Sequence, residues 1–139
     1  MGRITQMAQE LAQHYRNLRY ALTDKLITSV AALKDSHRLV ISTQFSEATI
    51  YPCPAFNWLF RAHHDSLHLK HDLDFTLASE IEVTKRGLRE LSLDTSPLLA
   101  DLYWSDNVGQ QLYFYKHGAF PVNQIAFIES YLKGETCFK

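Results

Sequence analysis

The chain has few glycines, few cysteines and no long apolar run, and each shortage excludes a class of protein. Its 139 residues include only five glycines, and none of them forms a loop of the kind that cradles a phosphate. The two cysteines, Cys53 and Cys137, lack the spacing of a metal site. They would form a disulfide only if the fold brought them together. No apolar run approaches the roughly 18 residues that a membrane-spanning helix needs.

An excess of charge is absent as well. The 14 basic and 15 acidic side chains give a formal charge of −1, and neither sign forms a long block. A basic surface for nucleic acid is therefore not indicated. The first twenty residues are polar and amphipathic, without the apolar core of a signal peptide. With 46% hydrophobic residues, the chain can form a packed core, so we expect a single cytoplasmic domain spanning residues 1–139, with no membrane partner.

The spacing of the apolar residues predicts a mainly α fold of about five helices, with one β-hairpin inserted after the N-terminal helix. Residues 4–33 carry apolar side chains at gaps of three and four. This spacing predicts one long helix, or two helices broken near residues 22–24. Residues 38–45 and 48–52 are short runs rich in β-branched side chains, joined by a polar connection, and they predict the hairpin.

Four further helices are predicted, and their capping signals set the boundaries. They span residues 57–72, 77–93, 97–117 and 121–133, with start signals at Asn57, Thr76, Ser96-Pro97 and Pro121 and stop signals at Gly118 and Gly134. The third of them contains a polar stretch with Asp101, Asp106 and Asn107. Those side chains either are exposed or face the histidines of the first of these helices, and the sequence does not decide between the two.

The predicted helix 57–72 is the most informative part of the chain, because it holds four of the seven histidines. In a helix, His64, His68 and His71 fall within roughly a third of the circumference. Asp65 and Asp72 lie beside that line. Two imidazoles at positions i and i+4, with a carboxylate nearby, are what a divalent first-row metal ion takes from one helix.

A third ligand is expected from the next helix. A tight turn at residues 73–76 would fold that helix back, so that Glu80 completes a set of two histidines and one carboxylate with His64 and His68. Asp65 would then either orient a ligand or act as a catalytic general base. The sequence thus predicts a divalent metal ion, without distinguishing Zn, Mn, Fe or Ni and without naming a substrate. A metal-dependent hydrolase is the kind of enzyme that such a site would support.

The same histidines have a second interpretation, as a hydrogen-bonded structural network. Phe60 lies one turn before His64 on the same face, which indicates that the histidine line points inward. Inward-facing neutral imidazoles need partners, and a metal ion or paired carboxylates would supply them. As ligands or neutral acceptors they would have a pKa below the ordinary value of about 6.5, whereas pairing with carboxylates without metal would raise it.

One pattern resembles small uncharacterised proteins of bacteriophage and prophage origin. The shared residues are Phe60-Arg61-x-x-His64-Asp65-x-x-His68, then Phe75 and Glu80, and later His117-Gly118-x-Phe120-Pro121 within residues 111–127. The resemblance covers roughly the second half of the chain. It implies that the motif residues act as a unit, but the family has no assigned reaction. It also raises an alternative function: a non-enzymatic phage protein that modulates a host protein, with structural histidines.

Two better-known metal signatures are not met. HD phosphohydrolases hold their metal with a histidine, a His-Asp pair and a distant aspartate. Here the upstream histidine would be His37, at the start of a strand, and the chain is short for that all-helical fold. A zincin needs glutamate directly after the first histidine of His-x-x-x-His, where this chain has Asp65. The reaction therefore stays open at the level of the sequence.

Overall fold

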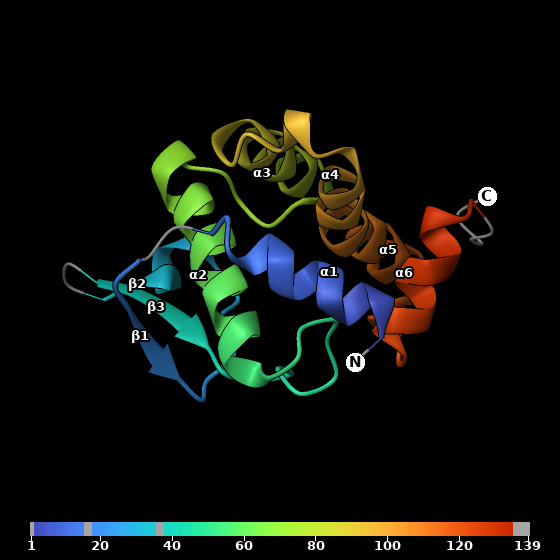
Figure 1. Ribbon diagram of the computed structural model, residues 1–139. Helices are drawn as coiled ribbons and strands as arrows, with labels where there is room; N and C mark the ends of the chain where they lie inside the picture. Colours follow the sequence, from blue (N-terminus) through green and yellow to red (C-terminus); the bar gives the residue numbers. More distant parts are fainter. Residues whose placement is uncertain (1, 16–17, 36–37, 135–139) are drawn as a thin grey trace.

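The structure, a computed structural model, describes residues 2–15, 18–35 and 38–134. It confirms a mainly α fold with a small β part after the first helix (Figure 1). The helices are α1 (Arg3–Ala12), α2 (Pro54–His71), α3 (Leu77–Glu90), α4 (Pro97–Trp104), α5 (Gln110–His117) and α6 (Gln124–Leu132). A π-helical turn, Ser105–Gly109, joins α4 to α5 without a break. The described part therefore contains five helical rods.

The β part differs from the predicted hairpin. Strand β3 (Arg38–Ser42) lies between β1 (Tyr20–Thr23), which pairs with it in parallel, and β2 (Lys34–Asp35), which pairs antiparallel. The prediction of helix across residues 20–23 was wrong, because pairing with β3 overrides the local helical spacing. The predicted strand 48–52 was also wrong.

The segment that was predicted as the second hairpin strand packs as irregular core instead. Ile50 and Tyr51 are consecutive and both buried, whereas a strand that covers one face alternates buried and exposed positions. Pro52 and Pro54 have no backbone N–H to donate to a sheet. The short β2, and not this segment, is therefore the antiparallel partner of β3.

Most predicted helix ends are confirmed, and the exceptions have local causes. Thr76 caps α3, Pro97 opens α4, and Gly118 follows α5 in the left-handed conformation, with φ 74°. Helix α2 starts at Pro54, before the predicted Asn57, because proline suits the first turn. Helix α6 starts at Gln124 and not at Pro121, since the Asn123 side chain accepts the N–H of Ala126.

Helix α2 is central, as its apolar residues on more than one side predicted. It packs against β3, α1 and α3, and it buries Ala62 and Leu67 together with His63 and His68. Helix α1 lies across the middle of the molecule and contacts α2, α4 and α6 (Figure 1). The main core therefore surrounds α1, and α2 carries its histidines along one border of that core.

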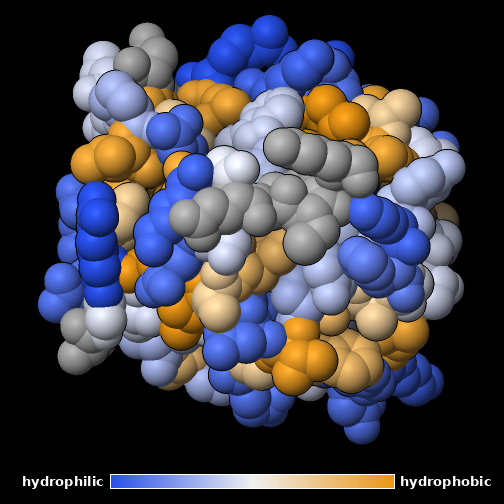
Figure 2. All heavy atoms as spheres, turned by 90° about the vertical axis from the view of Figure 1, so that its right-hand side faces the viewer, coloured by the Kyte–Doolittle hydropathy of each residue, from blue (hydrophilic) through white to orange (hydrophobic). Residues whose placement is uncertain are grey.

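The surface is mixed, as the balanced composition predicts. Figure 2 shows hydrophilic and hydrophobic side chains interspersed on the side of the molecule that faces right in Figure 1. Large apolar side chains that are exposed in the C-terminal half are Leu98, Phe114, Tyr115, Phe120, Val122 and Leu132. Within the described ranges no helix is both long and apolar enough to cross a membrane. Cys53 is exposed just before α2, and Cys137 lies outside the described residues.

Gly87 of α3 allows a close approach of Tyr103, and this contact gives a testable prediction. A Cβ added at Gly87 would lie 2.0 Å from the hydroxyl oxygen of Tyr103. We expect Gly87→Ala to lower the free energy of unfolding by about 1–3 kcal/mol through overpacking, although alanine favours helices by roughly 1 kcal/mol. Denaturant unfolding measures this change. In a Tyr103→Phe background the hydroxyl oxygen nearest to the added methyl group is absent, so Gly87→Ala should lower the free energy of unfolding by less. An equal decrease in both backgrounds would contradict the steric explanation.

Candidate metal centre

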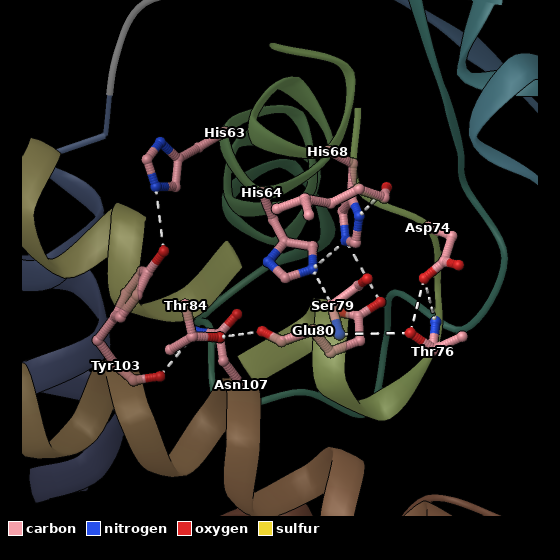
Figure 3. Close-up of polar contacts among 11 residues, drawn as sticks. His63, His64, His68, Asp74, Thr76, Ser79, Glu80, Thr84, Tyr103 and Asn107 are labelled. Atoms are coloured by element: carbon pink, nitrogen blue, oxygen red, sulfur yellow. Dashed lines mark hydrogen bonds and ion pairs between the residues drawn. The ribbon is translucent and has the colours of Figure 1, made fainter. Parts of the chain in front are cut away.

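Two histidines of α2 and a glutamate in the first turn of α3 converge on one point (Figure 3). Nε2 of His64 lies 2.9 Å from Oε2 of Glu80 and 3.1 Å from Nε2 of His68. Nε2 of His68 lies 3.3 Å from Oε1 of Glu80. Ligand atoms about 2.1 Å from one ion are separated by about 3.0 Å in octahedral and about 3.4 Å in tetrahedral coordination. The two imidazole nitrogens and the two carboxylate oxygens of Glu80 therefore have the spacing of ligand atoms around a single ion.

The turn between α2 and α3 brings Glu80 to the histidines. Asp72 ends α2 in the left-handed conformation, with φ 51°, and the N–H of Leu73 donates to the carbonyl oxygen of His68. This pattern is a Schellman-type helix end. Thr76 then caps α3, so Glu80 falls in its first turn and faces α2. The predicted turn at residues 73–76 thus produces the predicted neighbour.

The orientation of His68 is set by a backbone group. Its Nδ1 lies 2.9 Å from the carbonyl oxygen of Leu73, which can only accept, so Nδ1 carries a hydrogen. In the neutral ring Nε2 then has a lone pair directed at His64 and Glu80. Asp72, which the sequence places beside the histidine line, is exposed and ends α2.

His71 does not join the site. It follows His68 by one turn, but its Nδ1 accepts a hydrogen bond from Nη1 of Arg86, 2.7 Å away. Arg86 also pairs with Glu82, one turn earlier on α3. Of the three histidines predicted on one face, the structure therefore brings two together with Glu80.

Charge and burial at the site act against one another. Burial would lower the pKa of His64, but the charge and hydrogen bond of Glu80 outweigh it, so the pKa is raised above its ordinary value. Burial would raise the pKa of Glu80, yet the two histidines lower it to about 2. Without metal, His64 and Glu80 therefore form a buried ion pair. This is the outcome expected for histidines paired with a carboxylate.

Asp65, the predicted catalytic residue, interacts electrostatically with all three candidate ligands. Burial raises its pKa to about 6, with opposing effects of His64 and His68 and a further increase from Glu80. In the described part of the chain its carboxylate accepts no hydrogen bond from either ring. Asp65 is thus a carboxyl group whose charge is coupled to all three ligands.

Two further polar groups are His63, which the sequence prediction did not single out, and Asp106, one of the residues whose orientation the sequence left open. His63 is fully buried, stacks on Tyr15 with ring centroids 5.2 Å apart, and has Nε2 3.2 Å from the hydroxyl of Tyr103. Asp106 lies in the π turn, where burial raises its pKa to about 7. A histidine directly before His64 was a visible signal for the first. The orientation of the second was left open, because no sequence rule placed a π turn there.

Aromatic rings enclose the site. Phe60 lies 5.6 Å from His64, and Phe75 meets His68 edge-on at 4.9 Å, between ring centroids. The side chains of His64, His68 and Glu80 are 13%, 0% and 7% exposed. Low polarity strengthens electrostatic interactions within the site, and His64 is the most exposed of the three side chains.

Comparisons with models of known families, with characterised proteins and with solved structures find no match. The fold and the site therefore define the class of this protein: it is small and mainly α, with a group of two histidines and one glutamate that could hold a metal ion.

Proposed function

We propose that this chain is a metal-binding protein that holds one divalent first-row ion through Nε2 of His64, Nε2 of His68 and the carboxylate of Glu80. The observation that supports it is the convergence of the two imidazole Nε2 atoms and the two carboxylate oxygens of Glu80, at 2.9–3.3 Å. Such a convergence requires a cation between them, either protons or a metal ion. Two imidazoles and one carboxylate suit Zn, Mn, Fe or Ni better than Ca or Mg, which prefer oxygen ligands alone.

The donor set favours metal-assisted hydrolysis as the reaction class. A bound ion with three protein ligands lowers the pKa of a water molecule at its open position. Asp65 is a carboxyl group within electrostatic reach of all three ligands, and with a pKa of about 6 it can accept a proton at neutral pH. Glu80 stays ionised over the same range, so the roles of the two carboxylates are distinct.

The direct test is the metal content of protein purified without a histidine tag. We expect close to one equivalent of metal by elemental analysis, or a rise in Tm when Zn²⁺, Mn²⁺, Fe²⁺ or Ni²⁺ is added to chelator-treated protein. Absence of metal together with no rise in Tm for any of the four ions would refute the proposal.

Glu80→Gln tests the carboxylate ligand with a matched control on the same helix. The amide is similar in size but is a poor ligand for these ions, so we expect the Tm rise with Zn²⁺ to be lost. Glu82→Gln removes a carboxylate that pairs with Arg86 at the surface, and it should leave Zn²⁺ binding unchanged. Isothermal titration measures both affinities. Equal affinities in the two variants would exclude Glu80 as a ligand.

A second candidate function is a non-enzymatic interaction protein, of phage or prophage origin as the sequence resemblance suggests, that acts on a host protein. The burial of the site favours this second candidate, because none of the three side chains His64, His68 and Glu80 is more than 13% exposed. In that case the imidazoles and Glu80 form a structural ion-pair network, with protons in the place of the metal. The two candidates make different forecasts for the histidine variants discussed below.

A further inference from the structure

Glu80 presents both of its carboxylate oxygens to the imidazoles. Oε2 lies 2.9 Å from Nε2 of His64, and Oε1 lies 3.3 Å from Nε2 of His68. Figure 3 shows the carboxylate facing the two rings, with a dashed line from each ring to it. A carboxylate that binds an ion through one oxygen directs the other elsewhere, whereas a chelating carboxylate directs both oxygens to the ion. The arrangement in this site is the chelating one.

Backbone hydrogen bonds and burial hold Glu80 in place. Its N–H donates to the carbonyl oxygen of Thr76 at 2.9 Å, and its own carbonyl oxygen accepts from Oγ1 of Thr84 at 2.9 Å. Glu80 is 5% exposed, so close packing leaves its side chain little room to rotate. His68 is fixed in turn by the carbonyl oxygen of Leu73. The separations between the ligand atoms are therefore set by the helical hairpin of α2 and α3.

Two acceptor atoms approach one another at Oε1. With its hydrogen on Nδ1, the neutral His68 ring has a lone pair at Nε2, and Oε1 of Glu80 is an acceptor as well. Such a pair repels unless a cation lies between its two members. A proton on one nitrogen serves one such pair, whereas a chelated ion contacts both oxygens and both rings at once.

The separations suit an ion with six ligands better than a tetrahedral one. Two atoms ~2.1 Å from one ion subtend about 90° when they are about 3.0 Å apart, and about 109° when they are about 3.4 Å apart. The separations of 2.9 and 3.1 Å at His64 correspond to the first angle, and the separation of 3.3 Å at His68 lies between the two. The two oxygens of one chelating carboxylate subtend only about 60°. Tetrahedral coordination has no pair of positions at so small an angle.

We propose that Glu80 chelates the ion through both oxygens and thereby selects an ion with six ligands. The inference rests on the proposed function. Two imidazole nitrogens and two carboxylate oxygens fill four positions, so two remain. The low exposure of the three side chains restricts these two positions to water or another small oxygen ligand. Mn²⁺, Fe²⁺ and Ni²⁺ suit this set better than Zn²⁺, which proteins mostly bind with four ligands.

Co²⁺ tests the number of ligands, because its visible absorption is weak with six ligands and intense with four. Added to the chelator-treated protein, Co²⁺ should give weak absorption only. Glu80→His replaces the chelating carboxylate with a single nitrogen donor, so three imidazoles favour tetrahedral coordination and the absorption should become intense. By isothermal titration, this variant should also bind Mn²⁺ more weakly, relative to Zn²⁺, than the wild-type protein does.

Glu82→His is the matched control, since Glu82 lies on the same helix and pairs with Arg86. Its Co²⁺ spectrum should stay weak. An intense band in the wild-type protein means that Glu80 binds through one oxygen, which overturns the inference and leaves the proposed function standing. No binding of Co²⁺ or of the four ions named above refutes the proposed function itself. If Glu80→His does not fold, the wild-type spectrum alone decides between six ligands and four.

Discussion

Replacing His64 and His68 together by alanine should abolish metal binding and remove a large part of the stability of the metal-free chain. The variant has no imidazole left in the site, so Zn²⁺ should no longer raise its Tm. In chelator, the Glu80 carboxylate, 7% exposed, would be left buried without its partners. Breaking a buried ion pair in this way costs about 3–5 kcal/mol. Denaturant unfolding with and without Zn²⁺ measures both effects.

His71→Ala is the matched control for that variant. His71 lies on the same helix, is partly exposed and bonds to Arg86 and not to Glu80. Replacing His71 should lower the free energy of unfolding by less than about 1 kcal/mol and leave Zn²⁺ binding intact. If the wild-type chain binds no metal and the double variant still loses several kcal/mol, the histidines are a structural network. If the double variant binds Zn²⁺ as the wild type does, the site assignment is wrong.

The second large effect is a dependence of stability on pH that differs between the metal-free and the metal-loaded protein. The raised pKa of His64 gives a stabilisation that is complete below about 6.5 and is lost as the pH rises through the folded value. The pKa values of Asp65 and Asp106, raised to about 6 and about 7, act in the same direction. Glu80, lowered to about 2, contributes a constant amount above 4.5. Metal-free protein should therefore lose stability as the pH rises from 5 to 8.

With metal in excess the trend should not persist. Protons compete with the ion for the imidazole nitrogens, so metal affinity rises with pH, and the stabilisation by bound metal rises with it. The gap between the free energies of unfolding with Zn²⁺ and with chelator should widen from pH 5 to pH 8. Denaturant unfolding at several pH values measures the gap. A flat profile in both conditions would contradict the ion pair as well as the metal site.

What could be predicted from the sequence is what local rules determine. The spacing of His64 and His68 places them on one helix face whatever lies around them. The capping side chain of Thr76 fixes the start of α3, and with it the place of Glu80. Each of these needs only a few neighbouring residues, so the proximity of the three predicted metal ligands could be anticipated.

The rest depends on contacts between distant parts of the chain. Strand β1 forms because β3 lies beside it, against its own helical spacing. The acceptor for His68 is the backbone carbonyl of Leu73, which every residue type possesses and no pattern reveals. Asp106 lies in a π turn, which no local sequence rule places there. These features follow from tertiary packing.

The three candidate ligands are close in sequence, with 16 positions between His64 and Glu80, and this limits what a bound ion would hold together. As a cross-link it would close a ring about as long as a 15-residue disulfide loop, for which the loss of chain entropy is worth roughly 3 kcal/mol. The tether would join α2 to α3 only. The sheet, α1 and the C-terminal helices would gain nothing directly from it, so loss of the ion would loosen one helical hairpin and leave the remaining scaffold to the packing around α1.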